Sequence, residues 1–158
     1  MDNRIVINTG PLIALARMEA MDIIAKLPFV FICPSQVEAE IAAGLAQGHS
    51  VIAPSWLKVM ALAAPLSPLI LAALDEGEAS VIQLALEQGI PRVCIDEIKG
   101  RRAAVATGLS VLGSLGLMGR AKALGLIAEA RPFIEKAMRE GIHYREDLVH
   151  GVLNALGE

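Results

Sequence analysis

The stretch RIVINTGP, residues 4–11, decides how the chain begins to fold. It opens with three consecutive β-branched side chains after the arginine, which is typical of a buried strand. Asn8 and Thr9 end that strand, and Pro11 suits the first turn of a helix because no backbone N–H is needed there. The stretch therefore predicts a strand followed at once by a helix over residues 12–27, in one piece or two.

Strands and helices are predicted to alternate along the rest of the chain. Further strands are expected at 29–33, 92–95 and 109–112, whereas 56–62 fits either a strand or a helix. Further helices are expected at 35–46, 66–74, 79–88, 98–107, 114–124, 132–140 and 145–156. Such alternation indicates a parallel sheet with right-handed connections and helices on both faces. We therefore expect one three-layer α/β/α domain over residues 1–158, with a core at about 4–125 and C-terminal helices at 130–157.

The composition limits the classes of function. Aromatic residues make up only 3% of the chain, so few side chains are available to stack on nucleobases. The net charge of −3 gives no overall attraction to nucleic acid, and binding of a polyanion must rely on a local basic patch or a metal ion. Cys33 and Cys94 lie in apolar runs without a CxxC pair, so we expect reduced core thiols in a cytoplasmic protein.

Two long uncharged runs could be membrane spans or could be buried in an interface between subunits. Residues 66–74 and 103–119 are interrupted by proline or glycine, which argues against a membrane span. We expect instead that the Ala- and Leu-rich helix surface is buried in a homodimer.

Polar side chains follow two of the predicted strands. Asn8 and Thr9 come after the first strand, and Asp96 and Glu97 come after the strand at 92–95. In open parallel sheets, ligands bind beyond the carboxyl ends of the strands, which makes these residues candidates for a site. Each residue type also suits a turn or a helix N-cap, and that interpretation stays open.

Glu78 is unusual because its predicted helix places it on an apolar face. It lies on the same face as Val81, Ile82 and Ala85, where a carboxylate is costly without a partner for its charge. A cation would be one such partner. A capping arrangement with Asp75 explains the position equally well.

Glu40 is the second candidate acid on a helix. Ser35 and Glu38 match a capping box, which gives Glu38 a local partner, whereas Glu40 has none and borders the apolar stripe of its helix. Glu40 is therefore the better candidate for a cleft, and an exposed surface acid is the alternative.

A divalent cation would account for all of these residues together. Carboxylates that lie close together repel one another, and a cation removes that cost. Oxygen ligands favour Mg²⁺ or Mn²⁺, and such an ion can activate water and offset charge on a phosphoryl group. Lys99, Arg101 and Arg102 follow the acidic pair and could hold phosphates, although a solvated helix face is the alternative.

Five segments carry a resemblance to a known family. They are VINTGPLIAL (6–15), CPSQVEAEI (33–41), LDEGEA (74–79), CIDE (94–97) and GLSVLGSLG (108–116), followed by Ala121 and Lys122. In this order they resemble PIN domains, and more narrowly a prokaryotic branch similar to toxin-type (VapC-like) ribonucleases encoded beside small antitoxin-like partners. The GSLG stretch is the most distinctive of them.

The resemblance implies a metal-dependent RNA endonuclease, with RNA and a small antitoxin protein as partners. The implied acid positions fall on Asn8, Glu40, Glu78 and one of Asp96 and Glu97. The implied ligands of Mg²⁺ or Mn²⁺ are Glu40, Glu78 and Asp96, and the residues expected to contact RNA are Thr9, Lys99, Arg101 and Arg102.

Two positions depart from the family pattern. Asn8 replaces the usual first aspartate, and Ile95 stands where many PIN domains have Thr or Ser. Asparagine keeps a carbonyl ligand but removes one negative charge, so metal affinity should fall. The alternative function is therefore a catalytically degenerate PIN domain that binds nucleic acid or protein.

Overall fold

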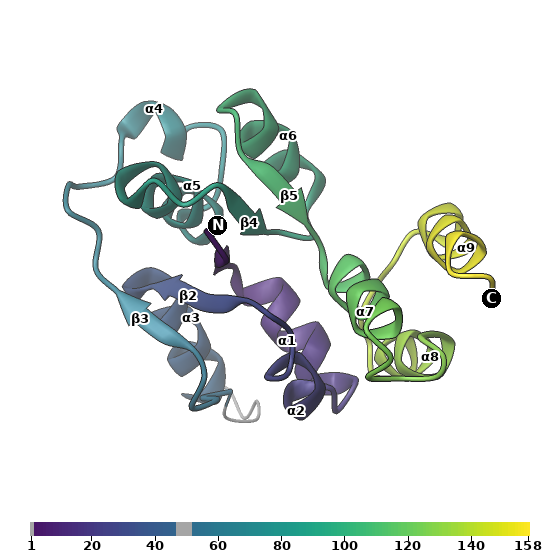
Figure 1. Cartoon of the computed structure of the whole chain (residues 1–158). Coiled ribbons are helices and arrows are strands. Elements are labelled where there is room, and N and C mark those ends of the chain that lie inside the picture. Colours follow the sequence, from purple (N-terminus) through teal and green to yellow (C-terminus); the bar gives the residue numbers. More distant parts are fainter. Residues whose placement is uncertain (1, 47–51) are drawn as a thin grey trace.

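The first strand of the sequence is the centre of the sheet. The computed structural model describes residues 2–46 and 52–158, and in it β1 (Arg4–Ile7) pairs with β2 (Val30–Pro34) on one side and β4 (Arg92–Cys94) on the other. The edge strands are β3 (Lys58–Met60) and β5 (Ser110–Leu112), and the order is β3-β2-β1-β4-β5 (Figure 1). Every pairing is parallel, which confirms the predicted α/β fold.

Helices connect the strands and extend beyond the sheet at the C-terminal end (Figure 1). The predicted helix over 12–27 forms as two pieces, separated near Glu19, which adopts a positive φ of 56°. The helices in the described part of the chain are α1 (Thr9–Arg17), α2 (Met21–Ile24), α3 (Ser35–Ala46), α4 (Pro68–Leu71), α5 (Glu76–Gln88), α6 (Ile98–Ala106), α7 (Ser114–Ala123), α8 (Arg131–Arg139) and α9 (Glu146–Ala155).

Two helices begin three residues earlier than the sequence pattern predicts. Helix α1 starts at Thr9 rather than residue 12, because Pro11 is compatible with the first turn. Helix α5 starts at Glu76 rather than residue 79, because the Asp75 side chain accepts a hydrogen bond from the Glu78 N–H at 2.8 Å and caps the helix. Both early starts bring a helix N-terminus close to the carboxyl ends of the strands.

The strand order reverses between β1 and β4. From β1 the chain builds outward to β2 and β3, then returns to the other side of β1 to form β4 and β5. Because such connections are right-handed, the reversal puts α1 and α6, the helices that follow β1 and β4, on opposite faces of the sheet. The loops leaving β1 and β4 therefore diverge, and in folds of this type the crevice between them binds ligands.

The core runs through both faces of the central strands. Ile5, Val6 and Ile7 of β1 are fully buried, and Cys33 and Cys94 are free thiols buried in the same core. The C-terminal helices add Ile134, Ala137 and Leu153 to this core; α8 packs on α1, and α9 packs on α7 (Figure 1). Within residues 2–46 and 52–158, no helix is both long and apolar enough to cross a bilayer.

The core position of β1 gives a direct test of the fold. Replacing Ile5 with Ala removes a fully buried side chain from the central strand and should lower the free energy of unfolding by about 2–5 kcal/mol. The control is Val105→Ala on α6, where the side chain is 63% exposed and the change should stay within about 0.5 kcal/mol. Urea denaturation measures both, and equal losses would contradict the described core.

Candidate active site

Asn8 lies where β1 and β4 end. Its backbone N–H donates to the Cys94 carbonyl at 3.0 Å, so the residue after β1 is tied to the last residue of β4. The side chain is only 7% exposed, and no described protein group donates a hydrogen bond to Oδ1. A buried oxygen left in this state costs about 1–3 kcal/mol. Asn8 Oδ1 is therefore an oxygen available to a ligand.

Glu40 reaches Asn8 from α3, the helix that follows β2. The Thr9 hydroxyl donates to Glu40 Oε2 at 2.9 Å, and Thr9 is itself buried. Gly77 faces the same space, because a Cβ there would lie 2.7 Å from Glu40 Oε2, 3.1 Å from Asn8 Oδ1 and 3.5 Å from Asp75 Oδ1. Three oxygen atoms thus border a small volume that the missing side chain of Gly77 leaves open.

Glu78 is buried beside this volume, with 5% of its surface exposed. Burial, and to a smaller extent the negative charges of Asp75 and Glu97, raise the pKa of its carboxyl to about 7, while the Asp75 backbone N–H offsets part of the effect. Helix α6 comes close here, since a Cβ on Gly100 would lie 3.3 Å from Glu78 Cδ. Within the described residues, no ion pair neutralises Glu78.

Both interpretations of Glu78 remain compatible with this geometry. The cap predicted from Asp75 is present, because Asp75 Oδ1 accepts the Glu78 N–H. The carboxyl group is nevertheless buried beside two other acids, Asp75 and Glu97. A cation between them would lower its pKa and supply the missing counter-charge.

Asp96, after β4, is held by the start of α7. Its Oδ1 accepts the Ser114 N–H and its Oδ2 accepts the Ser114 hydroxyl, both at 2.8 Å. Burial raises the pKa of Asp96, and the Ser114 donors and the Arg101 charge oppose that rise. The Ser114 hydroxyl also lies 2.6 Å from the Tyr144 hydroxyl. Sequence reasoning missed Ser114 as a site residue, although it lies in the GSLG stretch, and it had no signal for Tyr144.

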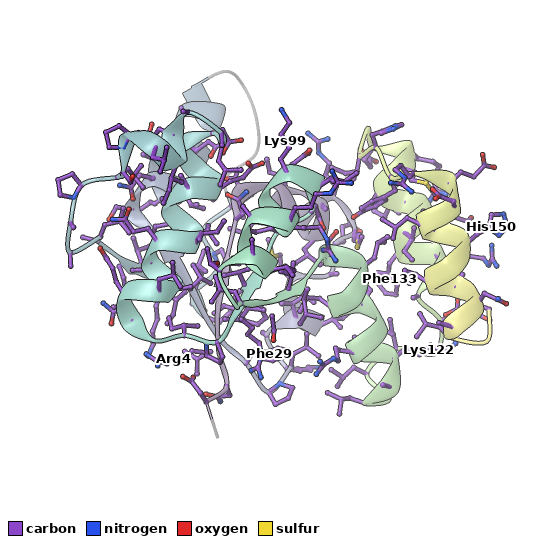
Figure 2. All side chains as sticks on the ribbon, turned by 90° about the horizontal axis from the view of Figure 1, so that it is seen from above. Arg4, Phe29, Lys99, Lys122, Phe133 and His150 are labelled. Atoms are coloured by element: carbon purple, nitrogen blue, oxygen red, sulfur yellow. The ribbon has the colours of Figure 1, made fainter. Side chains whose placement is uncertain are left out.

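The remaining sequence candidates lie on or beside α6. Glu97 is exposed at the N-cap position, makes no capping hydrogen bond, and places its charge near Glu78. Arg101 donates from Nη1 to the Ile95 carbonyl at 2.9 Å, so part of its guanidinium is engaged at the end of β4. Lys99 and Arg102 are exposed, and Figure 2 shows Lys99 extending from α6 into solvent.

The candidates thus form three neighbouring groups. Asn8, Thr9 and Glu40 meet at Gly77, Glu78 lies with Asp75 and Glu97, and Asp96 is joined to Ser114. Among residues 2–46 and 52–158, no three His, Cys, Asp or Glu side chains are arranged to hold one metal ion.

These groups still fit a hydrated Mg²⁺ or Mn²⁺ ion. Mg²⁺ keeps several water ligands and is usually held by one or two carboxylates, so a cluster of three is not required. The unpartnered Asn8 Oδ1 and the nearby Glu40 carboxylate supply suitable oxygens. A cavity of about 600 Å³ opens next to them, lined by Ser35, Gln36, Ala39, Glu40, Asp75, Glu76 and Gly77.

Comparison with known families gives one match. The model of a family described as a PIN domain matches residues 4–158. No curated protein and no solved structure shows significant similarity to the chain. Because the family match extends from β1 through α9 and includes both strand ends of the site, this chain belongs to the PIN domain family.

Proposed function

We propose that this PIN domain is a divalent-metal-dependent RNA endonuclease. The family indicates a nuclease-type fold that binds nucleic acid and generally uses divalent metals. The observation that carries the proposal is the buried Asn8 Oδ1, which has no hydrogen-bond donor among the described residues and faces Glu40 at the switch point of the sheet. Buried amide oxygens in proteins are normally hydrogen-bonded, so an oxygen without a donor calls for an ordered water or an ion as its partner.

In this proposal, Asn8, Glu40 and Glu78 would hold the metal, and Asp96 or Glu97 would complete the acidic site. A bound Mg²⁺ or Mn²⁺ would supply an activated water and offset negative charge on the scissile phosphodiester. Thr9 keeps the Glu40 carboxylate directed at the site through its hydroxyl.

Glu78 adds a group that can change its protonation near neutral pH. Its pKa of about 7 allows the carboxyl to hold or release a proton there, as a general acid or base requires. Lys99 and Arg102 are exposed on α6 and would contact RNA phosphates, and the charge of Arg101 acts on Asp96.

A degenerate PIN domain that only binds nucleic acid or protein is the second candidate. The uncharged Asn8 and the lack of a three-carboxylate cluster in the described ranges favour it. The two candidates differ in metal binding, because a ligand that binds only the folded state raises the melting temperature. Millimolar Mn²⁺ should stabilise the nuclease and leave the binding module unchanged.

The toxin role and the partners are further parts of the proposal. The resemblance of residues 4–125 to toxin-type ribonucleases supports a small antitoxin partner, and a neighbouring reading frame for such a protein would test this. Exposed apolar side chains such as Leu69 and Leu86 support a homodimer, which light scattering at micromolar concentration would test. Two buried thiols, Cys33 and Cys94, are compatible with the reducing cytoplasm that we propose as its location.

Metal binding should depend on the Glu78 proton. Without metal, Glu78 has a pKa of about 7 in the folded chain and of about 4.5 in the unfolded chain, so between these pH values only the folded chain keeps the proton. The free energy of unfolding should therefore fall as pH rises from about 4.5 to 7, by on the order of 2 kcal/mol. Mn²⁺ must displace this proton below pH 7. We therefore expect calorimetric Mn²⁺ affinity to drop by about tenfold per pH unit below 7 and to level off above it.

The variant Glu78→Gln should remove both pH effects and weaken Mn²⁺ binding. The matched control is Glu135→Gln on α8, which makes the same chemical change at a 47% exposed position and should behave like the natural chain. An unchanged pH profile in Glu78→Gln would show that the proton belongs to another group.

Restoring the family's first acid should strengthen the metal site. Asn8→Asp adds one negative charge beside Glu40, although dehydration of the carboxylate and repulsion from neighbouring acids offset most of the gain. A net gain of about 1 kcal/mol, or several-fold in Mn²⁺ affinity, is expected together with faster cleavage of single-stranded RNA. Calorimetry and a cleavage time course measure the two effects.

The control for Asn8→Asp is Asn154→Asp, the same change at an exposed position of α9. Equal behaviour of the two variants would mean that Asn8 is only a turn residue. RNA binding without Mn²⁺ binding or cleavage, in the natural chain and in Asn8→Asp alike, would favour the binding module.

A further inference from the structure

A chain of three hydrogen bonds joins the candidate site to the loop between α8 and α9. The Ser114 N–H and hydroxyl each donate to one oxygen of Asp96 at 2.8 Å. Because the single hydroxyl hydrogen of Ser114 is directed to Asp96, the 2.6 Å contact with Tyr144 requires the tyrosine to donate. The chain therefore runs in one direction, from Tyr144 through Ser114 to Asp96.

The surroundings of this chain strengthen it. Ser114 is fully buried, and hydrogen bonds linked in series inside a protein polarise one another. Burial raises the pKa of Tyr144 well above its usual range, so its hydroxyl stays protonated and remains a donor. Asp96 accepts two bonds, and a carboxylate offers about four acceptor positions. The chain thus fixes the orientation of Asp96 and leaves acceptor positions free.

A second contact holds the loop that carries Tyr144. Arg17 at the end of α1 donates from Nη1 to the Glu140 carbonyl at 3.0 Å, just after α8. Gly141 follows with a φ of 96°, and Arg17 Nη1 would lie 3.5 Å from a Cβ at that position. Because α1 begins at the site with Thr9 and ends at Arg17, it links the site to the loop that carries Tyr144.

We propose that Ser114 and Tyr144 are positioning residues, which hold the Asp96 carboxylate in one orientation so that the C-terminal helices complete the active site. The proposal rests on the nuclease function proposed above. An aspartate without these contacts would rotate about its side-chain bonds, and ordering it on each binding event would cost affinity and rate. The competing explanation is that Asp96 only caps α7.

The test compares Tyr144→Phe and Ser114→Ala with the natural chain. Tyr144→Phe removes one hydroxyl and keeps the ring, and loss of such a supporting contact should lower Mn²⁺ affinity or kcat on single-stranded RNA by about tenfold, with KM little changed. The matched control is Thr107→Val, which removes a hydroxyl that donates to the Ala104 carbonyl at the far end of α6. The control should keep both Mn²⁺ affinity and kcat.

The double variant decides whether Tyr144 acts through Ser114. If it does, Tyr144→Phe should lower kcat and the urea midpoint in the natural background, and change neither in the Ser114→Ala background. A lower urea midpoint with unchanged Mn²⁺ affinity and kcat would mean that these hydrogen bonds only cap α7, and it would overturn the proposal. Additive urea midpoints would overturn it as well.

The same series separates this inference from the proposed function. If the natural chain neither binds Mn²⁺ nor cuts RNA, the nuclease function fails. In that case, urea midpoints measured without metal still test the hydrogen-bond path from Tyr144 through Ser114. Non-additive midpoints of the single and double variants support the path, and additive midpoints refute it.

Discussion

The hydrogen bond from the Asn8 N–H to the Cys94 carbonyl is the contact on which the site depends. It joins the ends of the two central strands at the one point where the strand order reverses. Beyond this hydrogen bond the two segments that leave β1 and β4 separate, because one continues into α1 at Thr9 and the other into α6 at Ile98. The crevice therefore follows from the topology, and the residues on either side of it become neighbours although they are far apart in sequence.

The second constraint is the negative charge gathered in that crevice. Glu78 is buried beside Asp75 and Glu97, and its pKa of about 7 reflects both the burial and the repulsion. An aspartate in place of Asn8 would add a further charge next to Glu40. Asparagine keeps the oxygen and avoids that repulsion in the metal-free state. If the proposed metal site is present, the residue at position 8 sets a balance between stability without metal and affinity for it.

Much of the fold was predictable because its signals are local. The β-branched run at 5–7 and the alternation of strands and helices identify a parallel sheet, and the apolar face around Glu78 correctly predicts that this acid is buried. The helix starts at Thr9 and Glu76 were placed too late, although Pro11 and the Asp75 cap are visible in the sequence, because the apolar periodicity used to set the bounds begins only after the first turn.

The contacts between distant segments were not predictable from local patterns. The Thr9 hydroxyl donates to Glu40, which lies 31 positions away, and no local pattern predicts this contact. Tyr144 reaches Ser114 across 30 positions from a loop without any motif. Such contacts are set by the packing of whole helices on the sheet.

The helix N-termini explain how the acids are tolerated. Glu78 lies in the first turn of α5, Gly100 brings the first turn of α6 against it, and Asp96 accepts the N–H of Ser114 at the start of α7. The positive end of a helix dipole stabilises a nearby carboxylate, by about 0.3–1 kcal/mol at exposed sites and more when partly buried. The N-termini of α5, α6 and α7, which lie at the carboxyl ends of the strands, therefore offset part of the negative charge before any cation binds. Burial, together with the remaining charges of Asp75 and Glu97, leaves the pKa of Glu78 raised, and a divalent ion would offset both effects.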